Sequence, residues 1–124
     1  ERGKIAFLVV DYVQILTPDP RVKGSNREQE ISHITKRLKN LAVSHDCVVM
    51  TASQLNKMGK VRESEAIEHD CDVCLVLSEL SQQGYESRIG LTVEKNRHGT
   101  KGRKLVLAWD KALYRFRDLE MDDE

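Results

Sequence analysis

Two short apolar runs flank a long amphipathic stretch in the first half of the chain. The runs lie at residues 5–10 and 48–52 and contain no charged side chain. An unbroken apolar run of this length predicts a strand that is covered on both faces, as in the parallel sheets of α/β proteins. Two closely spaced prolines, Pro18 and Pro20, predict a loop after the first run.

Residues 27–45 show the periodicity of an amphipathic helix. Asn26 is a candidate N-cap, and Gln29 follows three residues later in the spacing of a capping box. Apolar residues then recur every three or four positions, so they fall on one face of the helix. We expect this face to be buried against the sheet; its members are Ile31, Ile34, Leu38, Leu41 and Ala42.

The second half of the chain is predicted to consist mostly of strands. Residues 81–86 and 96–102 are polar and predict turns, and residues 66–69 suit one turn of helix. The predicted order is strand, long helix, strand and then several strands. This order is typical of an α/β fold with a parallel core and a C-terminal antiparallel extension. Residues 118–124 form an acidic tail that is expected to fray. The strand-like segments are residues 73–77, 89–94, 105–109 and 113–116.

Composition narrows the function classes. The 20 Lys and Arg residues balance the 20 Asp and Glu residues, so any nucleic-acid contact has to come from local basic loops rather than from a global field. No apolar run reaches the roughly 18 residues of a transmembrane helix, and the N-terminus lacks the cleavage pattern of a signal peptide. We therefore expect a cytoplasmic protein with no membrane partner.

The cysteines carry no predicted chemistry. An odd number of them, Cys47, Cys71 and Cys74, argues against a disulfide framework and favours a reducing compartment. Cys71 and Cys74 have the spacing of half a zinc motif, but no second Cys or His pair lies at metal spacing, so both are expected in the core.

Two polar sites follow the two apolar runs. Asp11 ends the first run, where nucleotide-hydrolysing α/β folds place the carboxylate that holds magnesium. Gln54 follows the second run, and its neutral amide can hydrogen-bond a terminal phosphate and release it after hydrolysis. Taken singly, each residue also suits an ordinary solvated strand end.

Residues 95–104 carry five cations and no acid. Lys95 and Arg97 alternate, so in an extended stretch both would project to the same side. Two cations that converge on one point suit a phosphate, where an arginine stabilises charge developing in a transition state. A solvated basic hairpin is the alternative for this segment alone.

Five collinear segments resemble the DnaB-type replicative DNA helicases, over residues 4–116. They include Asp-Tyr-Val-Gln, which begins at Asp11, Ser-Gln-Leu-Asn-Lys, which begins at Ser53, and Lys-Asn-Arg-His-Gly, which begins at Lys95. The other two are the helix at residues 27–42 and the segment at residues 62–72.

The resemblance implies that residues 1–124 are the C-terminal half of a RecA-like helicase ATPase domain, the half after the phosphate-binding loop. It implies that Asp11 coordinates Mg²⁺, that Gln54 senses the γ-phosphate of ATP, and that Arg97, with Lys95, reaches the nucleotide site of a neighbouring subunit. A central loop would follow the phosphates of single-stranded DNA, partly through backbone N–H groups. The residues of that loop are Arg62, Glu63 and Glu65.

The implied parent protein is a homo-hexameric, ATP-hydrolysing enzyme of DNA replication, with a primase or a helicase loader as a further partner. This chain departs from the family pattern, because it contains no Gly-Lys-Ser/Thr loop and no catalytic glutamate before Asp11. The isolated chain is therefore expected to be inactive.

Two further departures bear on the DNA contact: a shortened loop at residues 57–62 and Glu65 in place of a glycine. Two alternatives to the helicase stay open. One is another RecA-like ATPase, a recombinase or a clock-type protein. The other is a non-catalytic remnant that binds DNA or a helicase.

Overall fold

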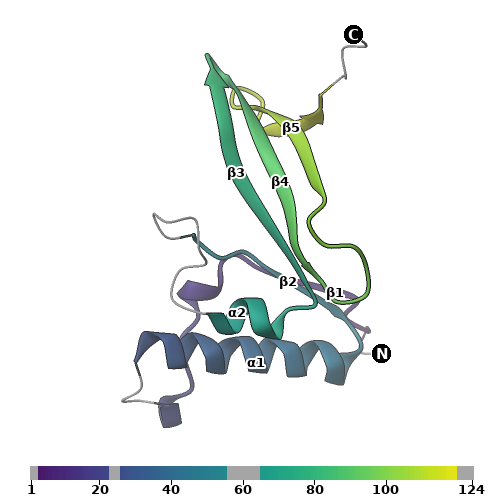
Figure 1. Ribbon diagram of the computed structural model, residues 1–124. Helices are drawn as coiled ribbons and strands as arrows, with labels where there is room; N and C mark the ends of the chain where they lie inside the picture. The colour runs from purple at the N-terminus through teal and green to yellow at the C-terminus, as the bar shows by residue number, and fades with distance from the viewer. Residues whose placement is uncertain (1–2, 23–25, 56–64, 120–124) are drawn as a thin grey trace. The chain divides into compact units, whose positions relative to one another are not determined.

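The computed structural model describes residues 3–22, 26–55 and 65–119 of the 124-residue chain (Figure 1). The chain forms two compact units, Glu1–Cys71 and Asp72–Glu124. The first unit contains β1 (Phe7–Val10), η1 (Val13–Ile15), η2 (Pro20–Val22), α1 (Arg27–His45), β2 (Val48–Thr51) and α2 (Glu65–Asp70). The second unit contains β3 (Val73–Gln83), β4 (Glu86–Asn96), β5 (Lys104–Asp110) and β6 (Arg115–Asp118).

The two apolar runs form the predicted parallel pair. β1 and β2 align with Phe7 opposite Val48 and Val10 opposite Thr51, and α1 connects them. One part of the prediction is wrong within the described residues, because one side of each strand stays open rather than covered. Side chains there are more than half exposed: Phe7, Val9, Val48 and Met50.

The long helix begins and ends where its sequence pattern predicts. The Asn26 side chain accepts a hydrogen bond from the Gln29 N–H at 2.9 Å, and Gln29 Oε1 accepts one from the Asn26 N–H at 3.3 Å, so the capping box is complete. At the other end Asp46 closes the helix in the left-handed region, with φ 48°.

The core of the first unit lies between α1, η1 and α2 rather than chiefly against the sheet. Ile31 and Ile34 of α1 are buried with Val13 of η1 and Ile67 of α2. Thr35 is also buried, and its hydroxyl donates to Asp70 Oδ2 at 2.8 Å, which fastens α2 to α1. The predicted apolar face of the helix is therefore used, but its main partners are two short helices.

The second unit is the predicted antiparallel extension, a sheet in the order β3-β4-β5-β6. Its first hairpin differs from the prediction of a loop at residues 81–86, because the strands continue until Gln83 pairs with Glu86. The turn is only Gly84 and Tyr85, and Gly84 takes φ 58°, a region that glycine adopts readily. The last strand begins at Arg115, later than predicted, after a turn at residues 111–114.

The chain therefore has a mixed α/β fold with a two-stranded parallel sheet and a four-stranded antiparallel sheet. In the second unit Ser87 and Ala108 are buried, and the Trp109 ring packs on Phe116 with centroids 4.6 Å apart. No helix in the described part of the chain is long and apolar enough to cross a membrane.

Candidate functional site

The ends of β1 and β2 bring Asp11 and Gln54 to one edge of the parallel sheet. Val10 pairs with Thr51, Asp11 follows β1 directly, and Gln54 lies shortly after β2. The two segments stay together beyond the strands, because the Ala52 N–H donates to the Val10 carbonyl at 3.3 Å. Asp11 and Gln54 are both exposed. The sheet therefore presents a carboxylate and a neutral amide at the same edge.

The Asp11 carboxylate fits magnesium bound together with phosphate oxygens. Mg²⁺ prefers oxygen ligands and is usually held by one or two carboxylates, water and substrate phosphates. Asp11 offers an exposed carboxylate at a strand end. Over residues 3–22, 26–55 and 65–119, no three His, Cys, Asp or Glu side chains gather as they would around a metal held by protein groups alone.

Gln14, the last residue of the Asp-Tyr-Val-Gln segment, is a functional candidate to which the sequence analysis assigned no role. Its Nε2 donates to Ser53 Oγ at 2.8 Å in a half-buried contact between the two strand ends. Its Oε1 is buried and has no hydrogen-bond partner among the described residues, which is uncommon because such an acceptor costs free energy. The available sequence signal was a polar residue between the apolar Val13 and Ile15.

The second unit holds the predicted arginine finger in the turn after β4. Lys95 lies within β4, which ends at Asn96, so Arg97 is the first residue of the turn. The Arg97 N–H donates to the Asp72 carbonyl at 2.8 Å, and Arg97 Nη1 lies 2.9 Å from Asp72 Oδ1. Asp72 therefore holds both the backbone and the side chain of Arg97, a contact that the sequence did not predict.

The chain reverses between the end of β4 at Asn96 and the start of β5 at Lys104, where a turn is predicted at residues 96–102. The left-handed backbone position falls at Gly102, with φ 80°, and the Gly102 N–H donates to the Val93 carbonyl at 2.7 Å. A Cβ atom at Gly99 would lie 2.5 Å from Asn96 Nδ2, so any larger residue would displace the Asn96 side chain.

The residues predicted to contact DNA are largely outside the described part of the chain. Arg62 and Glu63 lie in residues 56–64, which the structure does not describe, and Glu65 is the first residue of α2. α2 confirms the helical turn predicted at residues 66–69. The DNA contact itself stays a prediction.

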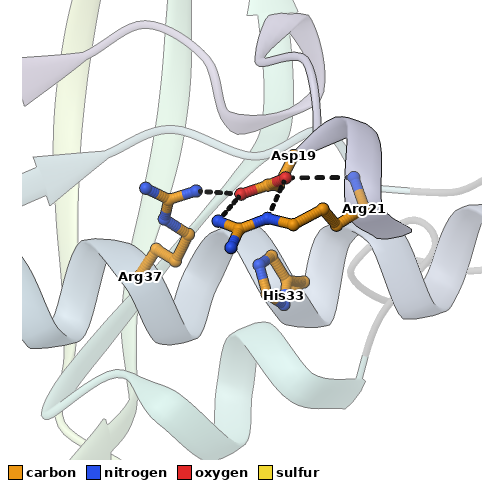
Figure 2. A pocket seen from close by; sticks show the side chains of 4 residues that line it. All are labelled: Asp19, Arg21, His33 and Arg37. Carbon is orange, nitrogen blue, oxygen red and sulfur yellow. Dashed lines mark hydrogen bonds and ion pairs between the residues drawn. The ribbon is translucent and has the colours of Figure 1, made fainter. Parts of the chain in front are cut away.

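A charged pocket of about 450 Å³ lies beside α1 in the first unit (Figure 2). Asp19 accepts hydrogen bonds from Arg21 Nη2 at 2.7 Å, from Arg21 Nε at 3.0 Å and from Arg37 Nη1 at 3.1 Å. The Arg21 side-chain bonds, followed by the bond from the Arg21 N–H, hold the pKa of Asp19 well below its usual range. Because Arg37 belongs to α1, this cluster fastens the preceding loop to the helix; His33 completes the pocket lining.

Comparison with known proteins gives one family across the chain. The family described as "DnaB-like helicase C terminal domain" matches residues 1–118. A "Probable replicative DNA helicase" of Trieres chinensis is 36% identical over 88 residues, which cover 62% of this chain and 19% of that protein. "Replicative DNA helicase DnaB" of Geobacillus stearothermophilus is 31% identical over 135 residues, which cover 97% of this chain and 29% of that protein.

"Replicative DNA helicase DnaC" of Bacillus subtilis strain 168 is 30% identical over 135 residues, which cover 97% of this chain and 29% of that protein. The chain thus spans less than a third of the length of these relatives. The 135 aligned positions exceed the 124 residues of the chain, so these two relatives contain residues that this chain lacks.

Proposed function

The chain belongs to the DnaB-like helicase C-terminal domain family, and from this membership we propose that its parent protein is an ATP-dependent replicative DNA helicase. Residues 1–124 form the C-terminal half of its RecA-like ATPase domain, after the phosphate-binding loop. The subunits form a hexameric ring, and ATP hydrolysed between neighbours drives translocation on single-stranded DNA and unwinding of the duplex. The ring acts in the cytoplasm, where a primase or a helicase loader binds it.

The shared edge of Asp11 and Gln54 is the observation that carries this proposal. Ligands of open α/β sheets bind outside the carboxyl ends of the strands, and β1 and β2 end together there. Asp11 supplies an oxygen ligand to the magnesium ion that accompanies ATP, and Gln54 donates from its amide to the terminal phosphate. When bound there, a magnesium ion would neutralise charge on the phosphate oxygens.

Lys95 and Arg97 complete the nucleotide site of the neighbouring subunit. Phosphoryl transfer spreads negative charge over the equatorial oxygens, and a guanidinium can donate parallel N–H bonds to them. Arg97 suits this role because it lies in a turn and its side chain is 46% exposed. An arginine supplied by a neighbour makes hydrolysis depend on assembly of the ring.

The DNA contact is proposed for Arg62, Glu63 and Glu65. Arg62 is the cation that would meet a phosphate, and the two acidic residues would contribute their backbone N–H groups. Because Glu65 begins α2, this contact would include the N-terminus of that helix.

Substitution of Asp11 in the parent protein tests the proposal. Asp11→Asn keeps the shape of the side chain and removes the charge that holds Mg²⁺, so DNA-stimulated ATP hydrolysis should fall by roughly a hundredfold. The matched control is Asp46→Asn, which removes an exposed carboxylate paired with Lys4 at 2.8 Å in the same unit. It should hydrolyse ATP like the wild type. Unchanged hydrolysis and unwinding by Asp11→Asn would exclude the proposed site.

A further inference from the structure

Asp72 and Arg97 lie just beyond the paired ends of β3 and β4. The last register pair joins Val73 to Asn96, and the Arg97 N–H continues the ladder with its 2.8 Å bond to the Asp72 carbonyl. In addition to this backbone bond, the two side chains form an ion pair, with Arg97 Nη1 2.9 Å from Asp72 Oδ1. Two different contacts therefore join the same two residues.

The ion pair between the Asp72 and Arg97 side chains contributes little to the stability of the fold. The backbone bond already closes this end of the hairpin, and the turn is closed again by the Gly102 N–H bond to the Val93 carbonyl. The two side chains are 43% and 46% exposed, and exposed ion pairs add little to stability. The ion pair thus adds little stability, but it sets the direction of the guanidinium.

Orientation matters for an arginine that has to reach a phosphate. A free arginine side chain samples many rotamers, and ordering it on binding costs conformational entropy. A guanidinium carries five N–H donors in a rigid fork, so a contact through Nη1 leaves donors for a second anion. An acidic side chain beside the arginine can thus fix the direction of the guanidinium while leaving some of its N–H donors available.

We propose that Asp72 is a positioning residue for Arg97, which orders the guanidinium at the end of β4 before it meets the phosphate of the neighbouring subunit. This inference rests on the proposed role of Arg97 as the finger. Asp72 touches neither nucleotide nor metal in this scheme, and it acts through Arg97.

The test compares Asp72→Asn and Asp72→Glu in the full parent helicase, with kcat and KM of DNA-stimulated ATP hydrolysis as the readout. Asp72→Asn should lower kcat by about tenfold to a hundredfold, as a displaced catalytic group does, while the KM for ATP changes less than about twofold. Asp72→Glu keeps the charge and should restore part of kcat. If Asp72→Asn fails to assemble, Asp72→Ser takes its place with the same readout: a lower kcat at unchanged KM supports the inference, and wild-type kcat overturns it.

Glu86→Gln is the matched control. Glu86 pairs with Arg117 at the opposite end of β4, and these side chains are 44% and 49% exposed, close to the values for Asp72 and Arg97. This variant should keep wild-type kcat. An equal loss of kcat in Glu86→Gln would show a general effect of removing an acid from the sheet and would overturn the inference.

Arg97→Ala separates failure of this inference from failure of the proposed function. If Arg97→Ala hydrolyses ATP like the wild type, the finger role is wrong and the positioning role falls with it. If Arg97→Ala is inactive but Asp72→Asn has wild-type kcat, the finger stands and the positioning role is wrong. In the Arg97→Ala background, Asp72→Asn should change the residual rate less than about twofold. A further large loss there would mean that Asp72 acts independently of Arg97.

Discussion

The side-chain amide of Gln14 donates a 2.8 Å hydrogen bond to the Ser53 hydroxyl, which joins the segment after β1 to the segment after β2. Loss of a half-buried bond of this kind should lower the free energy of unfolding by about 1 to 2 kcal/mol in Gln14→Ala. A double-mutant cycle with Ser53→Ala, measured by urea unfolding of the chain, should give a coupling energy of about 1 kcal/mol.

The matched control is Gln82→Ala. Gln82 is exposed, and its side chain makes a long 3.4 Å bond to the Gly84 carbonyl, so its loss should change stability by less than about 0.5 kcal/mol. Strictly additive effects of the Gln14 and Ser53 substitutions would show that the bond contributes nothing in solution.

Ile31 and Leu38 lie on the same face of α1 but differ in burial. Ile31 is fully buried, whereas Leu38 is partly buried at the edge of the same cluster. Ile31→Ala should therefore cost about 2–5 kcal/mol, and Leu38→Ala should cost clearly less. Val43→Ala, on the exposed side of the helix, should stay within about 0.5 kcal/mol of the wild type. Equal losses at Ile31 and Leu38, again by urea unfolding, would contradict the core as described.

Asp19 gives the chain an acid-sensitive contribution to stability. The hydrogen bonds from Arg21, joined by the charge of Arg37, lower the pKa of Asp19 in the folded chain. Its stabilising contribution is therefore complete above the unfolded pKa of about 3.9 and is lost as the pH falls toward the lower folded pKa. Between about pH 5 and pH 2, the wild type should lose more thermal stability than Asp19→Asn, which lacks the titrating group.

The control for this titration is Asp46→Asn, which leaves the Asp19 cluster intact and should follow the wild-type pH dependence of the unfolding midpoint. Parallel curves for the wild type and Asp19→Asn would mean that the two arginines do not hold Asp19 in solution.

Arg97→Ala in the parent helicase should separate binding from hydrolysis. Nucleotide affinity should change little, because the phosphate loop and Asp11 of the binding subunit remain, while DNA-stimulated hydrolysis should fall by up to about 10³–10⁵-fold, the range of arginine fingers in related reactions. Titration with a fluorescent nucleotide and a steady-state hydrolysis assay measure the two quantities.

Mixed rings provide the decisive comparison for this arginine. Combining Arg97→Ala subunits with subunits that carry a defective phosphate loop should restore part of the activity, because an intact finger and an intact loop then meet at some interfaces. Absence of recovery in rings shown to be mixed would place Arg97 outside the neighbour's site, as a solvated cation or a DNA contact.

Elements with strong local signals could be predicted from the sequence. The spacing of Asn26 and Gln29 is enough to define the start of α1, because both capping bonds form within four residues. The apolar runs of β1 and β2 likewise specify strands, although not their exposure, and the helix between them favours parallel pairing. The edge that holds Asp11 and Gln54 follows from those signals.

Contacts between distant segments could not be predicted in this way. Residues 78–83 are polar except for Leu80, so the sequence gives no sign that β3 continues through them; an exposed strand needs no apolar alternation to pair with its neighbour. The contacts of Gln14 with Ser53 and of Asp72 with Arg97 depend on how chain segments meet in space. The spacing of motifs along the sequence does not show which of their residues meet in space, so these two pairings came only from the structure.

The two-residue turn at Gly84 and Tyr85 also bears on the order in which the molecule folds. β3 and β4 are neighbours in sequence, so their pairing closes a loop of two residues. β1 and β2 are separated by the whole of α1, so their pairing closes a much longer loop. Loop-closure entropy rises with loop length, and hairpins form within about 1–10 μs. The β3–β4 hairpin, which is followed by Arg97, is thus expected to form early and independently. The sheet edge with Asp11 is expected to form later, because it requires β1 and β2 to pair across a long stretch of chain.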